Sequence, residues 1–402
     1  MRVNRFRSPR RMAGFGLVEI MVAMVIGMIA ILVVMQVFFG SEARGRTAGG
    51  NADAQSIGAI TFMQLQSQIK RAGYGIDSVA LFGCPLSWSL PGGTAIAKPI
   101  TAAPVGINPI TVSGGVASAL LPGGDPNTDT LLVVYGTDNG QPQGNVVSSI
   151  ASQTYTVQMP GAFGIGDRVV LANSTSPDSC GGTRLIDRIT AVNPLSVQVQ
   201  TGQSGATLFN LGRGPNGANA AISSSNPSNG PAILAYAVRN GNLTVCDFSV
   251  NDCSLAANQN SSTVWVPIAS NVVSMRATYW RDTSAAWDGS SSSIDQTTPD
   301  PAQPNFACNW ARIKAIKLVL VVQNPERDKD IVTTTTKNGV SAANANRPTW
   351  DQDAVAPLVA NTGALGPDLV ADEEWKHYRY KTFQSLIPLR NVAWMGKPTG
   401  CP

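Results

Sequence analysis

A single carboxyl group, Glu19, lies inside an otherwise apolar stretch near the N-terminus. From Phe15 to Phe39 the only other interruptions are Gln36 and two glycines, and Ile20 to Met35 contains no polar side chain. Placing one carboxylate in a membrane costs about 2.5–3.5 kcal/mol unless the charge is paired. We therefore expect Glu19 to have a cationic partner.

A new chain terminus would supply that partner. Cleavage after Gly14 would create an amino group on Phe15, one helical turn from Glu19, and Glu19 of a neighbouring copy could meet the same amine. A cleavable secretory signal is disfavoured because its apolar region is about 7–15 residues long and precedes the small residues, whereas here Ala13-Gly14 comes first. A plain signal anchor fits the length but leaves Glu19 unexplained.

The residues around this junction strongly resemble the processing site of type IV prepilins. They read Gly14-Phe15-Gly16-Leu17-Val18-Glu19-Ile20-Met21-Val22-Ala23. The resemblance implies that a prepilin peptidase cuts after Gly14 and methylates the new amino group of Phe15. It also implies that Glu19 guides the docking of the subunit during assembly.

Six cysteines follow the apolar stretch: Cys84, Cys180, Cys246, Cys253, Cys308 and Cys401. An even number in an exported domain predicts three disulfides, for which 15 pairings exist. Cys246 with Cys253 is the safest pair, because the short segment between them contains the turn-forming Asn251-Asp252. The pairs Cys308 with Cys401 and Cys84 with Cys180 follow only by elimination and sequence order. Zinc is disfavoured, since no C-x-x-C occurs and His377 is the sole histidine.

Other chemical patterns are weak. A G-x-G-x-x-G string at 212–217 contains a proline and precedes no apolar helix, which predicts a loop. His377 could act as a base for a serine nucleophile, but the chain contains no G-x-S-x-G motif. The carboxylate pairs at 328/330 and 351/353 could bind calcium, but they lack the other ligands of a calcium loop. We expect no catalytic residue, no cofactor and no metal.

Seven of the eight tryptophans lie in the second half of the chain: Trp265, Trp280, Trp287, Trp310, Trp350, Trp375 and Trp394. Buried tryptophans would belong to the core, whereas exposed ones would mark a partner or receptor surface. The sequence leaves both interpretations open, including an adhesive role.

The composition argues against an enzyme and against a nucleic-acid-binding surface. Charged residues make up only 13% of the 402, about half the usual share. Five of the 29 basic side chains are arginines within residues 1–14, so the rest of the chain has 24 basic against 25 acidic side chains. The basic leader is expected to stay in the cytoplasm and send the remainder outward.

The elements follow from the hydrophobic patterning. Residues 15–39 are expected to form a transmembrane helix, and residues 40–75 an amphipathic continuation that ends at Gly73-Tyr74-Gly75. A continuous helix from Phe15 to Gly73 would measure roughly 89 Å. The predicted buried face of the continuation contains Ile57, Ile60, Phe62, Leu65, Ile69 and Ala72.

Residues 76–402 are predicted to form a β-rich globular domain with long loops, giving an α+β fold. Candidate strands are Thr130–Tyr135, Tyr155–Met159, Arg168–Leu171, Leu185–Thr190, Ser196–Gln200, Ile233–Arg239, Val272–Trp280, Ile313–Val322 and Tyr378–Leu389. The expected long loops are Gly202–Asn229, Thr283–Pro304 and Thr333–Pro367.

Several segments resemble one pilin subfamily, the PilW-type minor pilins. They are Arg71–Gly75, Asp129–Tyr135, Gly166–Val170, Tyr236–Thr244 and Pro388–Asn391. The resemblance implies a pilin fold, with the helical spine packed under the β-rich domain, and a low-abundance subunit that starts or caps a type IV pilus. Adhesion, motility or DNA uptake would be downstream roles.

The same resemblance implies the partners and the location. Partners would be other minor pilins, the major pilin, the prepilin peptidase and, before assembly, the inner membrane, with the C-terminal domain in the periplasm and later at the cell surface. A minor pseudopilin of a type II secretion system is one alternative. A membrane-anchored periplasmic enzyme or binding protein is the alternative from another class.

Overall fold

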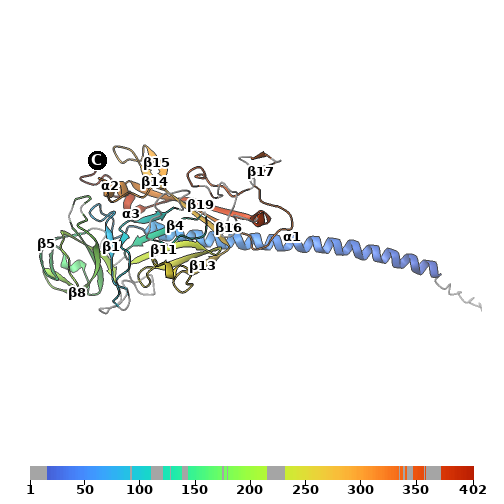
Figure 1. Ribbon diagram of the computed structural model, residues 1–402, viewed down its shortest axis with the longest axis horizontal. Coiled ribbons are helices and arrows are strands. Elements are labelled where there is room, and N and C mark those ends of the chain that lie inside the picture. Colours follow the sequence, from blue (N-terminus) through green and yellow to red (C-terminus); the bar gives the residue numbers. More distant parts are fainter. Residues whose placement is uncertain are drawn as a thin grey trace, which may run out of the picture. The chain divides into compact units, whose positions relative to one another are not determined.

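The computed structural model describes residues 16–90, 93–109, 121–126, 128–137, 144–173, 176–178, 180–214, 231–334, 336–337, 340–341, 347–356, 358 and 373–402. The chain divides into two compact units, Met1–Ala52 and Asp53–Pro402. Helix α1, Leu17–Arg71, begins in the first unit and ends in the second (Figure 1, blue). A long apolar N-terminal helix followed by a β-rich region confirms the α+β class.

The described part of the first unit, residues 16–52, is formed by the first part of α1. Gly27, Gly45 and Gly49 do not interrupt the helix, and a Cβ added at any of them would meet no atom within 4 Å. By length and composition this helix can cross a membrane: its most apolar 18-residue window has a mean hydropathy of 2.9 and no part of it is buried.

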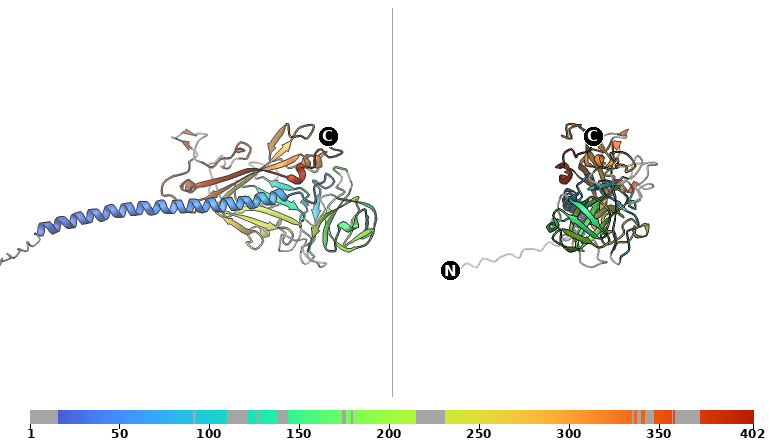
Figure 2. Two further views of the ribbon diagram at one scale, coloured as in Figure 1. Left: turned by 180° about the vertical axis from the view of Figure 1, so that it is seen from behind. Right: turned by 90° about the vertical axis from the view of Figure 1, so that its left-hand side faces the viewer.

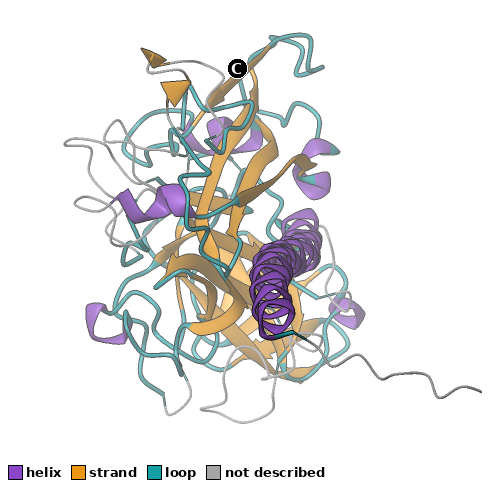
Figure 3. Cartoon of the chain, turned by 90° about the vertical axis from the view of Figure 1, so that its right-hand side faces the viewer, coloured by secondary structure: helices purple, strands orange, loops and turns teal. Residues whose placement is uncertain are grey.

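The part of α1 in the second unit buries one face. Ala54, Phe62, Leu65, Ile69 and Ala72 are at most 7% exposed and belong to the main core, as the 3.6-residue period predicts. Figure 3 shows the helices in purple and the strands of the second unit in orange. Ile60 was expected on this face and is 55% exposed. At 100° per residue it lies about 140° around the helix from Leu65, so the prediction was wrong for that side chain.

A five-stranded antiparallel sheet forms the centre of the second unit. Its order is β13-β12-β11-β4-β3. The bounds are β3 Val105–Asn108, β4 Thr130–Tyr135, β11 Ala232–Arg239, β12 Asn242–Asp247 and β13 Val266–Ser270. Strands β4 and β11 are buried along their whole length, because one face packs in the cluster that holds α1 and the other in a second cluster around Trp88 and Trp265.

A four-stranded antiparallel sheet lies beside it, in the order β15-β14-β16-β19. The bounds are β14 Val272–Asp282, β15 Ser292–Asp295, β16 Ile313–Gln323 and β19 Tyr380–Pro388. Helices α2, Phe306–Ala311, and α3, Arg390–Ala393, flank β16 and β19 in sequence. A short hairpin, β17 Thr336–Lys337 and β18 Val340–Ser341, and the 3-10 turns Pro160–Ala162, Ala256–Asn258 and Glu373–His377 complete the assignment.

The remaining strands form an eight-stranded sheet, part of which closes into a barrel. They are β1 Pro85–Ser87, β2 Ile100–Thr101, β5 Asn145–Ala151, β6 Thr154–Val157, β7 Asp167–Ala172, β8 Arg184–Val192, β9 Ser196–Val199 and β10 Thr207–Arg213. Strands β5 to β10 close into a ring, because the sheet order β8-β7-β10-β5-β6-β9 is completed by pairing of β8 with β9 (Figure 2, green). The ring has its own hydrophobic core. In the sequence its six strands are inserted between β4 and β11, which are paired directly with each other in the central sheet.

All nine candidate strands are present, Thr130–Tyr135 with its predicted bounds and the other eight with shifted ends, but the sequence patterns did not predict the remaining strands. All three expected loops contain strands: β10 lies in Gly202–Asn229, β15 lies in Thr283–Pro304, and β17 and β18 lie in Thr333–Pro367. Strand β10 is buried on both faces up to Gly212, so it shows no apolar–polar alternation. Residues 215–229 of the first loop, and much of Thr333–Pro367, lie outside the described residues.

Candidate assembly helix and its anchorage

Glu19, the one acid in the apolar stretch, lies in the first turn of α1. The backbone N–H groups of Glu19 and Ile20 donate to the carbonyl of Gly16, at 2.9 and 3.2 Å, and the Glu19 side chain is exposed. Gly14 and Phe15 lie outside the described residues. The cleavage junction and the pairing of Glu19 with the Phe15 amine therefore stay predictions.

The apolar surface after Glu19 has no cover within the first unit. Between Leu17 and Phe39 every large aliphatic or aromatic side chain is at least 47% exposed. Full burial of one such side chain is worth about 1.5–3 kcal/mol. A run of this length is stable only in lipid or against other apolar helices.

Phe383 on strand β19 packs closely against the second part of α1. The rings of Phe62 and Phe383 lie 6.4 Å apart between centroids. An added Cβ at Gly58 would lie 2.1 Å from Cε2 of Phe383, so only glycine lets the helix approach this ring. No sequence pattern identifies Gly58 as a contact site, because a lone glycine in a helical pattern indicates only a weaker helix at that position.

Two of the segments that resemble PilW-type minor pilins, Arg71–Gly75 and Pro388–Asn391, meet at the end of α1. Nδ2 of Asn391 donates to the carbonyls of Arg71 and Ala72, at 3.1 and 3.0 Å. Gly73 follows with φ of +85°, and its N–H donates to the carbonyl of Val134 at 2.8 Å. The helix thus ends at the predicted glycine, and Asn391 satisfies carbonyls that the helix leaves unpaired.

A buried ion pair joins the two antiparallel sheets. Arg276 on β14 and Asp129 before β4 are at most 3% exposed and lie 3.2 Å apart. Asp129 Oδ2 also accepts hydrogen bonds from the N–H of Ala277 at 2.9 Å and from Nε2 of Gln296 at 2.7 Å. Breaking such a pair is costly because it leaves one buried charge unmatched. Asp129 opens one of the resembling segments, and the network gives it a structural role.

The Gly166–Val170 segment has a similar role in the barrel. Oδ2 of Asp167 accepts from the N–H of Gly164 at 2.7 Å and from Nδ2 of Asn210 at 2.9 Å. Burial, with a further contribution from the nearby Arg188, lowers the pKa of Arg168 to about 10. Asp167 therefore ties the β6–β7 connection to strand β10.

Three disulfides brace the second unit: Cys84–Cys180, Cys246–Cys253 and Cys308–Cys401. These are the three pairs named from the sequence. The first links the turn after α1 to the β7–β8 connection, and the third links α2 to residue 401, near the last residue of the sequence.

The weaker candidate sites are occupied by structural contacts. Nδ1 of His377 lies 3.1 and 3.2 Å from the carbonyls of Asp328 and Asp330. The carboxylate of Asp328 pairs with Arg379, and those of Asp351 and Asp353 pair with Lys317 and Arg347. Among the described residues no cluster of three potential metal ligands occurs. Gly212 and Arg213 belong to β10, and the rest of their glycine string beyond Gly214 lies outside the described residues.

Most of the tryptophans belong to the core. Trp265, Trp287, Trp310, Trp350 and Trp375 are at most 6% exposed, whereas Trp394 is 86% exposed. Trp280 is intermediate. A clustered tryptophan surface is therefore absent from the part of the chain that the structure describes.

Two family models match the chain. One, described as type IV pilus-assembly protein W, covers residues 235–391, and the other, the prokaryotic N-terminal methylation motif, covers residues 9–35. No curated protein and no solved structure matches. The first match begins within β11, runs through β19 and ends at Asn391, which donates to the end of α1. The second match covers the Glu19 segment. The two matches support a PilW-type, pilin-like protein related to the type IV pilus.

Proposed function

We propose that the chain is a non-enzymatic minor pilin, a structural subunit of the complex that initiates or caps a type IV pilus. The observation that carries the proposal is the contrast along α1. Its first part exposes a continuous apolar surface with one acid, while its second part is clamped by Phe383, Asn391 and the central core. Such a helix can transmit force from a filament core to an outer domain.

Processing would come first. The arginine-rich leader stays in the cytoplasm, the apolar helix crosses the inner membrane, and the C-terminal domain reaches the periplasm. The prepilin peptidase removes residues 1–14 and methylates Phe15. The three disulfides fit an oxidising compartment for the second unit.

Assembly would then bury the apolar helix among the helices of other minor pilins and the major pilin. Glu19 supplies the negative charge that an ammonium group on Phe15 needs in an apolar environment, on the same subunit or a neighbouring one. After assembly the β-rich domain faces the cell surface.

The test compares two acids on the same helix. Glu19→Val should still be cleaved and still reside in the inner membrane but should be missing from sheared pili, because the Phe15 ammonium loses its partner. Glu42→Val is the matched control, since Glu42 is exposed and paired only loosely with Arg46 at 3.9 Å. It should enter pili at the wild-type level.

Each outcome has one meaning. Incorporation of Glu19→Val at the wild-type level would contradict the docking role of Glu19. Absence of the wild-type protein itself from sheared pili, despite normal processing, would contradict the pilus assignment and favour a secretion pseudopilus. Gly14→Arg denies the peptidase the small residue before the cut. This variant therefore provides the unprocessed precursor as a reference for the measurements of cleavage and of incorporation into pili.

A further inference from the structure

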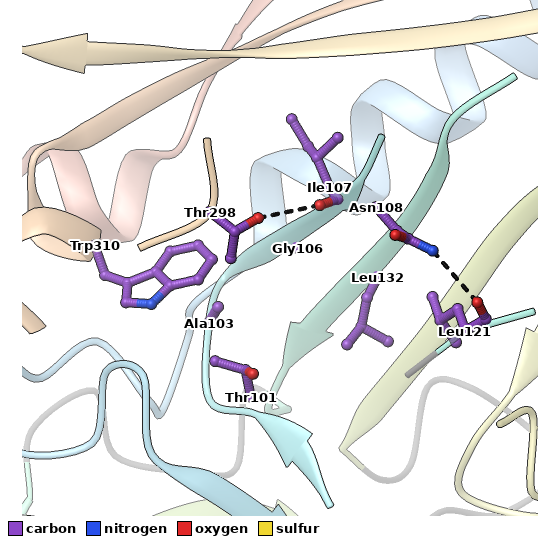
Figure 4. Close-up of a pocket in the computed structure, with 9 residues that line it drawn as sticks. All are labelled: Thr101, Ala103, Gly106, Ile107, Asn108, Leu121, Leu132, Thr298 and Trp310. Atoms are coloured by element: carbon purple, nitrogen blue, oxygen red, sulfur yellow. Dashed lines mark hydrogen bonds between the residues drawn. The ribbon is translucent and has the colours of Figure 1, made fainter. Parts of the chain in front are cut away.

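A small hollow lies beside the edge strand β3, and Ala103, Gly106, Leu132 and Trp310 are among the residues that line it (Figure 4). Its volume of about 40 Å³ admits water but not an organic ligand. This volume excludes the hollow as a site for a sugar, a nucleotide or a peptide.

The barrel formed by β5 to β10, at one end of the second unit, is covered by the rest of that unit on one side (Figure 1, β5 and β8). Val170 of β7, Ile186 of β8 and Phe209 of β10 point out of the barrel, are at most 5% exposed and pack in the cluster around Trp88. Strand β5 is instead exposed along most of its length, and every second residue of β6 and β9 is half-buried or exposed. The side made by β5, β6 and β9 therefore faces solvent.

This free side of the barrel is built from segments without charge. Residues 144–166 form β5, β6 and the loop that leads to β7, and they contain no Asp, Glu, Lys or Arg. Residues 189–212, which include the β8–β9 turn and all of β9, contain none either. About 25–35% of a soluble protein's surface residues are usually charged. The free side of the barrel therefore fits a partner that is itself uncharged.

Large aliphatic side chains are exposed in two of these uncharged segments. Met159 and Ile165 lie in the loop between β6 and β7 and are 55% and 56% exposed. Leu195 lies in the turn between β8 and β9 and is 74% exposed. Exposed apolar side chains that gather in one place mark an interaction surface.

The strand pairing brings the loop and the turn to the same end of the barrel. Thr156 of β6 pairs with Ser196 of β9, so β6 ends beside the turn that precedes β9. The N–H of Gly166 donates to the carbonyl of Ile189 on β8 at 2.9 Å, so the loop rejoins the barrel beside β8. We call this end, with Met159, Ile165 and Leu195, the apolar end of the barrel.

The loop is held in place by contacts with the barrel. Phe163, in the middle of the loop, is 6% exposed and belongs to the barrel core. The carbonyl of Ala162 accepts from Nδ2 of Asn210 at 3.1 Å. The exposure of Ile165, two residues after Phe163, is therefore part of the folded structure.

Arg213 is the cation that lies beside this loop. An added Cβ at Gly164 would be 2.3 Å from Nη2 of Arg213, which shows how closely the guanidinium approaches the loop. The side chain is 59% exposed and lies 3.6 Å from the buried carboxylate of Asp167. This pair has no net charge, so the apolar end gives no electrostatic preference for an anionic partner.

A lipid bilayer fits the apolar end better than a protein surface does. Aliphatic side chains on separate loop tips can enter the boundary between headgroups and acyl chains, where no complementary shape is required. The centres of protein interfaces are instead enriched in aromatic residues. Phe163 is the aromatic residue of this loop, and it is buried in the barrel.

We propose that the apolar end of the barrel is a membrane-contacting surface for a zwitterionic phospholipid bilayer. Met159, Ile165 and Leu195 enter the acyl boundary, and the exposed guanidinium of Arg213 lies at the level of the lipid phosphates. Contact through three side chains is peripheral and reversible, unlike insertion of a spanning helix. This binding role is separate from the assembly role of α1 and does not rest on it.

The experiment uses the full-length protein, held through α1 in nanodiscs of phosphatidylcholine and mixed with an excess of phosphatidylcholine vesicles. Flotation in a density gradient separates the vesicles from free discs, and the belt protein of the discs is measured in the floated fraction, so that only whole discs are counted. Discs that carry the wild-type protein should float with the vesicles, whereas empty discs should not. High salt or added phosphatidylglycerol should change the affinity by less than about twofold, because the surface has no net charge.

Two isoleucines of similar exposure provide a matched pair of variants. Ile165→Gln should weaken binding to the vesicles about tenfold, because one inserted aliphatic side chain is lost. Ile331→Gln is the control, since Ile331 is 52% exposed but directly follows residues 328–330, which are all charged. It should bind like the wild type. Adding Leu195→Gln to Ile165→Gln should weaken binding about a hundredfold.

Four results would overturn the proposal. They are absence of wild-type discs from the floated fraction, an equal loss in Ile331→Gln, wild-type binding by the double variant, and loss of binding at high salt. Association of discs with one another in the absence of vesicles, abolished in the double variant, would identify a second copy of the chain as the occupant instead of lipid. If Ile165→Gln lowers the denaturation midpoint, Leu195→Gln alone, in a different segment, gives the same comparison with Ile331→Gln.

Discussion

Replacing Gly58 by alanine should destabilise the protein, although the same change stabilises most helices. Glycine inside a helix costs about 1 kcal/mol relative to alanine. At position 58, however, the new Cβ would lie 2.1, 2.6 and 2.9 Å from three carbons of the Phe383 ring. The ring contacts Phe62 and its strand is paired along its length with β16, so it has little room to move.

The expected magnitude follows from these two effects. Overpacking of a filled core costs about 1–3 kcal/mol, so the net change at Gly58 should lie between neutral and about 2 kcal/mol destabilising. Gly49→Ala is the matched control, because it lies in the same helix with no atom within 4 Å of the new Cβ. It should gain up to about 1 kcal/mol.

The assay is the denaturation midpoint of both full-length variants in the same detergent. The difference between them isolates the overpacking cost and should be about 1–3 kcal/mol. Adding Phe383→Leu to Gly58→Ala should remove most of the cost of the alanine, since the two sites are in contact. If Gly58→Ala stabilised the protein as much as Gly49→Ala, the close approach of α1 to β19 would be refuted.

Three further predictions concern the second unit. Asn391→Ala should lower the stability by about 1–3 kcal/mol, because two hydrogen bonds to the end of α1 are lost. Asn391→Asp also lacks the N–H donor and should lower the stability at least as much. Denaturation midpoints of the two variants check both expectations. Removing Cys84–Cys180 should lower stability by roughly 4.7 kcal/mol and removing Cys246–Cys253 by roughly 2.5, because their sequence separations are 96 and 7 residues; equal losses in paired serine variants would contradict this loop-length argument. Burial raises the pKa of Asp77 to about 6 from 3.8, so the folded state holds its proton more tightly and stability should fall as pH rises from about 4 to 6. Asp77→Asn should flatten this part of the stability profile and be about 1–3 kcal/mol more stable than wild type at pH 7, and an unchanged profile would refute the assignment.

Local sequence patterns predicted helix α1 and its end, whereas the pairing of strands that are distant in the sequence could not be predicted. The apolar run and Gly73 determine where α1 lies and ends, because each depends on residues a few positions apart. Closure of the barrel depends on pairing of β8 with β9 and on β10, which is buried on both faces and therefore lacks alternation. Neither feature has a local pattern.

The candidate site divides in the same way. The chemistry of Glu19 stands out because one acid in an apolar run is conspicuous. The contacts of Gly58 with Phe383 and of Asn391 with Arg71 join residues more than 300 positions apart, so no spacing rule could reveal them. The segment Pro388–Asn391 resembles PilW-type minor pilins, and the structure adds the physical role of Asn391, which donates hydrogen bonds to the end of α1.

Mass spectrometry of the protein recovered from sheared pili tests the central claim most directly. The proposal predicts an N-terminal peptide that begins at Phe15 and carries one added methyl group on its amine. It also predicts that residues 1–14 are absent from the assembled protein. An intact leader, or an unmethylated terminus elsewhere in the apolar stretch, on protein assembled into pili would contradict the account.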